Sequence, residues 1–104
     1  MDSYIIDAAI CTNEKMLKNY FHYAEHFGPI KKRKYKNIEY WMTLFSDTTG
    51  FQIDLYYPKN AEPGEKIKVI VISNGTEKHI IEWIHERPGL IVEKIYPFII
   101  DMLF

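Results

Sequence analysis

The sequence predicts an α+β domain in which helices from both ends of the chain pack on a small antiparallel sheet. Two observations favour this class: apolar residues recur with helical spacing near both ends, and they alternate with period two in the middle. The length of 104 residues predicts one domain, residues 1–104. With 47% hydrophobic and 15% aromatic residues, the chain can fill a core of its own, which excludes a disordered tail.

The N-terminal segment is predicted to be helical, because apolar residues from 5 to 27 recur at the spacing of one helix face. Residues near Thr12 interrupt this pattern with cap-type side chains, so two shorter helices are an alternative. A strand at residues 4–10 is a third interpretation, which the alanines and the aspartate of that segment disfavour. The Gly-Pro pair at 28–29 ends the helix.

The middle of the chain is predicted to form a three-stranded meander. Apolar and polar residues alternate over 38–45 and again over 51–57, and a short polar turn that ends at Gly50 separates the two runs. Pro58 and the turn-rich residues 60–65 end the second strand. A third strand covers 67–73.

The C-terminal segment begins with a helix capped by Thr76, which buries isoleucines at 80, 81 and 84. The Pro-Gly pair at 88–89 ends this helix. Residues 90–104 are mostly apolar and are predicted to form a second helix kinked near Pro97. A strand at 90–95 is the alternative, and it would give a ferredoxin-like arrangement with strands at the chain ends.

The alternation also assigns the two faces of the meander. The buried face is predicted to hold Ile38, Leu44, Ile53 and Leu55. The outer face is predicted to hold an aromatic patch of Trp41, Phe45 and Tyr56. Exposed aromatic side chains with polar neighbours are typical of the core of a protein interface, so these three are the candidate interface residues.

A basic run at residues 31–36 holds five cations and no acid just before the first meander strand. Cations neutralise phosphates and aromatic rings stack on bases, so this run predicts a nucleic-acid surface. Its candidate residues are Lys31, Lys32, Arg33, Lys34, Lys36, Trp41 and Tyr56. The alternative is that the lysines protect a strand edge from pairing with other chains. The net charge is -1 and the rest of the chain is acidic, which favours a protein partner.

Histidines provide only weak metal candidates. His22, Glu25 and His26 reproduce the order of the inverted zinc-protease motif, with the two histidines one helical turn apart. A chain this short has no room for the cleft and the distant third ligand of those enzymes. We therefore expect no metal site, no cofactor and no catalysis.

Cys11 is the only cysteine, so no intrachain disulfide can form, and a reducing compartment such as the cytoplasm is expected. The N-terminus lacks the pattern of a signal peptide, and no apolar run approaches the roughly 20 residues that span a bilayer.

Taken together, the sequence predicts a small, non-enzymatic, cytoplasmic binding or regulatory domain that acts through protein–protein interaction as a homodimer. Its size and composition are those of a regulator or inhibitor of phage or virus type. Nucleic-acid binding through residues 31–36 and the aromatic sheet face is the alternative function.

Overall fold

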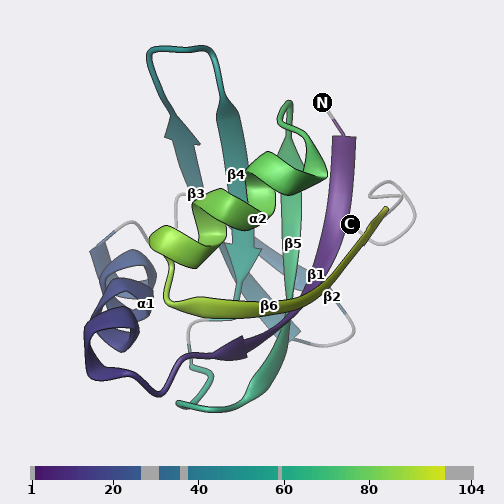
Figure 1. Cartoon of the computed structure of the whole chain (residues 1–104). Helices are drawn as coiled ribbons and strands as arrows, with labels where there is room; N and C mark the ends of the chain where they lie inside the picture. Colours follow the sequence, from purple (N-terminus) through teal and green to yellow (C-terminus); the bar gives the residue numbers. More distant parts are fainter. Residues whose placement is uncertain (1, 27–30, 36–37, 59, 98–104) are drawn as a thin grey trace.

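The computed structural model of the chain describes residues 2–26, 31–35, 38–58 and 60–97, with the backbone alone for 22–26 and 31–35. It confirms the α+β class, with one antiparallel sheet and two helices (Figure 1). Along the chain the elements are β1 (Asp2–Ile10), α1 (Glu14–His26), β2 (Lys31–Tyr35), β3 (Ile38–Ser46), β4 (Gln52–Tyr57), β5 (Lys66–Ser73), α2 (Glu77–Glu86) and β6 (Leu90–Pro97).

In the described part of the chain the sheet has six strands in the order β2-β3-β4-β5-β1-β6, and all neighbours are antiparallel. The predicted meander is present as β3-β4-β5, but it is half of the sheet rather than the whole. β5 and β6 both pair with β1, which lies between them, so β5, α2 and β6 form a split β-α-β crossover.

The predicted N-terminal helix is wrong over its first half, because Asp2–Ile10 is the strand β1. β1 pairs with β5 on one side and with β6 on the other, and both of its faces are buried. A strand buried on both faces has apolar residues without strict alternation, which resembles helical spacing. The interruption near Thr12 is real, but it separates a strand from a helix. Asn13 caps that helix, since its Oδ1 accepts a hydrogen bond from Lys15 N at 3.0 Å.

The predicted helix after residue 90 is also wrong, because Leu90–Pro97 is the strand β6. Its register on β1 runs from Ile10–Leu90 to Tyr4–Pro97. β6 therefore pairs with the edge of β1 that β5 does not occupy. The remainder of that prediction, residues 98–104, lies outside the described residues. The preceding helix α2 is confirmed, and its Thr76 N-cap accepts from His79 N at 3.1 Å.

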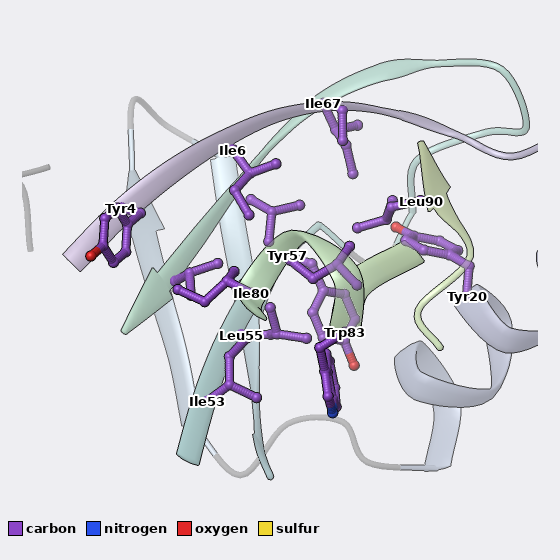
Figure 2. Close-up of a cluster of buried hydrophobic side chains, with 14 of the residues drawn as sticks. Tyr4, Ile6, Tyr20, Ile53, Leu55, Tyr57, Ile67, Ile80, Trp83 and Leu90 are labelled. Carbon is purple, nitrogen blue, oxygen red and sulfur yellow. The ribbon is translucent and has the colours of Figure 1, made fainter. Parts of the chain in front are cut away.

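The two helices pack on one face of the sheet, called here the helix side. Tyr20 of α1 joins α2 and the strands in the main core cluster, and Figure 2 shows these side chains converging between the helices and the sheet. The core residues drawn and labelled there are Tyr4, Ile6, Tyr20, Ile53, Leu55, Tyr57, Ile67, Ile80, Trp83 and Leu90.

The opposite face, called here the far side, has a smaller cluster of its own. This cluster runs across the sheet from Ile5 of β1 through Ile70 of β5 and Tyr56 of β4 to Tyr40 and Met42 of β3.

The predicted faces of β3 are reversed. Ile53 and Leu55 are buried on the helix side as expected, but Ile38 and Leu44 lie on the far side with 49% and 45% of their surface exposed. The length of the turn decides which residues of β3 share a face with Ile53 and Leu55. Ser46 pairs with Gln52, so five residues connect the two strands. An even number of connecting residues would be needed to place Ile38 and Leu44 on the same face as Ile53 and Leu55. A shift of one residue turns every side chain of a strand to the other face.

Candidate binding site

The central strand of the meander, β4, is shorter than both of its neighbours. The β4–β5 register ends at the Tyr56–Ile70 pair, and the β3–β4 register begins at the Trp41–Tyr57 pair. Beyond this point β3 continues over residues 38–40 and β5 over residues 66–69, with no β4 between them. The space between the two continuing strands is a groove of about 780 Å³, called here the slot. This volume lies within the range of known ligand pockets, roughly 300–1,000 Å³.

The chain leaves the sheet at Pro58, which has no N–H to donate to a ladder. The hydroxyl of Tyr20 donates a hydrogen bond to the carbonyl oxygen of Pro58, so helix α1 holds the departing chain on the helix side. Burial raises the pKa of Tyr20 and keeps the phenol neutral as a donor. Two backbone hydrogen bonds of 2.9 Å, Gly64 N to Ile10 O and Ile10 N to Glu65 O, tie the end of the loop to β1. The two ends of the 58–65 loop are thus bonded to neighbouring elements, to α1 at Pro58 and to β1 at Gly64 and Glu65.

The helix side of the slot is apolar with two acids. Its apolar lining residues are Ala8, Trp41, Ala61 and Ile67. Glu39 lies on this side, because its Oε1 accepts from Trp41 Nε1 at 2.9 Å. Glu65 also lines the slot, and its Oε1 accepts a hydrogen bond from Glu62 N at 3.3 Å. Among the described lining residues, none on this side is basic.

The far side of the slot holds charges that are already matched. Lys68 Nζ donates to Asp7 Oδ1 at 2.7 Å and to the Tyr96 hydroxyl at 2.9 Å, and these contacts raise the pKa of Lys68. Lys66 Nζ lies 3.6 Å from a carboxylate oxygen of Glu93. Glu93 is the extra residue of a β-bulge, since the neighbouring pairs are Asp7–Lys94 and Ala8–Val92. Each lysine here therefore has a carboxylate beside it.

The candidate interface residues do not form one patch. Trp41 and Phe45 lie on the helix side, opposite Tyr57 and Ile53 in the ladder, whereas Tyr56 belongs to the far-side cluster with 5% of its surface exposed. Phe45 packs against Trp83 of α2 with ring centroids 5.1 Å apart. Trp41 is half-buried and is the one of the three that lines the slot.

The basic run forms an edge strand. Residues 31–35 are β2, at one end of the strand order, and Lys32 pairs with Trp41 in the register. This position fits the protective role of lysines on an edge strand. The side chains of β2 and all of Lys36 lie outside the described residues. Because Tyr56 is buried, its ring is not available to stack on a base.

The histidine motif lies at the end of α1, where only the backbone is described. His22 and His26 are one turn apart in the helix, and their side chains lie outside the described residues. In the part of the chain that the structure describes, no group of three or more metal-ligating side chains comes together. Cys11 is buried. No helix within the described ranges is long and apolar enough to cross a membrane.

Comparisons with protein-family models, with curated proteins and with solved structures find no match for this chain.

The sequence patterns did not indicate the slot or its charged lining residues Asp7, Glu39, Glu65 and Lys68. One signal was present: Pro58 closes a second strand that is shorter than the strands on either side of it. Whether a short strand leaves a space between its neighbours depends on the register of the three strands, which the sequence pattern does not give.

Proposed function

We propose that the protein is a non-enzymatic binding domain that takes an extended segment of a protein partner into the slot as an added strand. The early end of β4 carries this proposal, because it leaves a strand-wide space between two strands that continue. Strand addition is a common way in which domains bind peptides.

The backbone of β5 supports this mode of binding. Residues 66–69 pair with β1 on one side, and the described residues give them no ladder partner on the side of the slot. In an antiparallel strand every second residue directs its N–H and C=O to the same side, so about two residues offer hydrogen bonds to a ligand. Each such bond contributes about 0.5–1.5 kcal/mol. Two strands that flank one missing strand are roughly 10 Å apart, which suits one added chain.

The exposed side chain of Ile38 adds an apolar contact at the mouth of the slot. The polar groups of the far side bond to one another, and Lys68 is held by Asp7 and Tyr96. This mutual pairing fits a binding surface better than a catalytic site. A domain with one buried thiol suits the cytoplasm, where we place its action as a regulator of the partner.

A titration with a defined peptide tests the proposal. The probe is a capped eight-residue peptide that alternates threonine and valine, and the readout is the amide spectrum of ¹⁵N-labelled protein. We expect shifts and slowed hydrogen exchange at residues 66–69. The same peptide with every second amide N-methylated is the control, since it cannot complete the ladder. Equal binding of the methylated peptide would contradict strand addition.

Two substitutions on one strand sharpen the test. Ile38→Lys is expected to weaken peptide binding roughly fivefold to tenfold, because it removes about 1 kcal/mol of apolar contact. Leu44→Lys is the matched control, since Leu44 lies on the same face of β3, is similarly exposed and does not line the slot. Light scattering of the unliganded protein measures its oligomeric state. A dimer that Ile38→Lys dissociates would identify a second copy as the source of the segment.

Nucleic-acid binding remains the second candidate, favoured by the cationic edge strand beside Trp41. It predicts retention on single-stranded nucleic acid at low salt that falls steeply as salt rises. Replacement of Lys31, Lys32, Arg33 and Lys34 by alanine would abolish that retention, and unchanged retention would exclude it.

A further inference from the structure

We infer that the slot takes the amino-terminal end of a partner chain, which enters as an antiparallel strand with its first residues against the end of β4. This inference rests on the proposed function and adds which part of the partner binds and in which direction. Two observations carry it: the inner end of the slot is closed, and the strands on its two sides run in the same direction.

The inner end of the slot, where β4 stops, is closed in the plane of the sheet. Tyr57 is the last residue of β4 and pairs with Trp41, so β4 itself occupies the position into which an added strand would continue. At the mouth of the slot, β3 begins at Ile38 and β5 begins at Lys66. A segment that lies in the plane of the sheet can therefore extend only past the mouth.

Both sides of the inner end are also filled. On the helix side the chain departs at Pro58, whose carbonyl oxygen accepts a hydrogen bond from the Tyr20 hydroxyl. On the far side Tyr40 and Tyr56 belong to one cluster and expose only 2% and 5% of their surface. Tyr40 lines the slot one residue beyond the last pair of β3 with β4, so this cluster reaches past the end of β4. A bound chain has no path through the inner end, so one of its ends lies there.

The directions of the flanking strands determine which end this is. β3 and β5 are both antiparallel to β4, so a strand between them is either antiparallel to both or parallel to both. Antiparallel pairing is slightly more stable per residue, and all neighbouring strands of the described sheet pair in this way. An antiparallel segment runs in the direction of β4. Its amino-terminal residue then lies at the inner end, and the chain leaves at the mouth.

The backbone of β5 gives the positions at which the segment pairs. Ile10 N donates a hydrogen bond to Glu65 O at 2.9 Å. This bond flanks the Ala9–Lys66 pair, so the N–H and C=O of Lys66 point away from β1 and toward the slot. Lys68 lies two residues further along the strand and directs its backbone groups to the same side. The segment therefore pairs first with Lys68, near the inner end, and two residues later with Lys66, near the mouth.

Three capped peptides test the inference by calorimetric titration. One is the eight-residue threonine–valine peptide, and the other two carry four additional prolines, either before its first residue or after its last. Proline has no N–H and cannot replace a strand residue in the ladder. We expect the carboxy-terminal prolines to leave the Kd nearly unchanged, because they lie beyond the mouth. The amino-terminal prolines are expected to weaken binding roughly tenfold or more, the loss of one or two hydrogen bonds, because the inner end does not admit them.

A spin label at the last residue of the eight-residue peptide reports the direction independently. We expect this label to broaden the amide signals of Ile38 and Lys66, at the mouth, more strongly than those of Tyr57 and Ile70, at the inner end. The diamagnetic form of the same label is the control.

The outcomes separate this inference from the proposed function. If the eight-residue peptide does not bind, the proposed strand addition is overturned, and the inference with it. If it binds and the two proline peptides have equal affinities, strand addition stands and the inference of a bound chain end is overturned. Weaker binding of the peptide with carboxy-terminal prolines alone, or stronger broadening at Tyr57 and Ile70, overturns the direction.

Discussion

Gly89 shows how one residue fixes the position of a helix. Its backbone has a φ of +74°, and a Cβ added there would lie 2.1 Å from the carbonyl oxygen of Met16 in α1. The chain between α2 and β6 thus passes directly against α1. A side chain at this position would be strained by its backbone and would push the helix away.

The substitution Gly89→Ala is expected to lower the free energy of unfolding by more than about 2 kcal/mol, because backbone strain adds to a steric clash. Gly50→Ala is the control, since Gly50 has a φ of +90° and nothing within 4 Å of the added Cβ. This control isolates the backbone strain, about 1–2 kcal/mol. Urea unfolding of both variants measures the difference, and equal losses would contradict the close approach to α1.

Tyr20 links helix α1 to the end of β4. The variant Tyr20→Phe removes the hydroxyl that donates to the Pro58 carbonyl, with an expected cost of about 1 kcal/mol. Burial raises the pKa of Tyr20 in the folded protein above its unfolded value of about 10. The stabilisation from the hydroxyl is therefore complete below pH 10 and is lost as the pH rises further. Unfolding of both proteins between pH 7 and 11 tests this, and a constant difference would contradict it.

At the scale of elements, the two edges of the sheet are protected in different ways. β2 has a cationic sequence, and β6 has a bulge at Glu93 and ends at Pro97. Both devices discourage pairing with another chain along the edge. The slot is different, because it lies between two strands of the sheet and not along an edge. The strand addition that we propose is thus directed to the interior of the sheet.

Helix α2 depends on its N-cap. The variant Thr76→Ala is expected to lower the free energy of unfolding by about 1 kcal/mol, because the His79 N–H loses its acceptor. Thr48→Ala in the exposed β3–β4 turn is the control and is expected to cost less than about 0.5 kcal/mol. Thermal unfolding compares the two, and a similar cost for both would argue against the cap.

At the scale of the whole molecule, the sheet is expected to exchange its amide hydrogens unevenly. Ile6 pairs with Val69 on one side and Ile95 on the other, so amides at the centre of β1 are expected to exchange slowest. Within residues 66–69, alternate amides directed to the slot are expected to exchange much faster than those directed to β1. Uniform protection across these four residues would show that the slot is closed in solution.

The sequence alone determined the parts of the fold that local rules control. Thr76 and the spacing of Ile80 and Ile84 predicted α2, and alternation with turn residues predicted the three strands of the meander. These signals suffice because a cap, a turn and an amphipathic stripe each depend on residues close together in the chain.

Only the tertiary structure decided the rest. β1 is a strand because it pairs with β5, far along the chain, as in the Ile6–Val69 pair. A segment that is buried on both faces shows no regular alternation of apolar and polar residues from which a strand could be predicted. The faces of β3 followed from the length of a turn, which alternation leaves open. The slot exists because β4 ends at Tyr57 while β3 and β5 continue past it. The register of the three strands determines that both neighbours extend beyond the same end of β4. Contacts between distant residues set these features, so no local pattern could predict them.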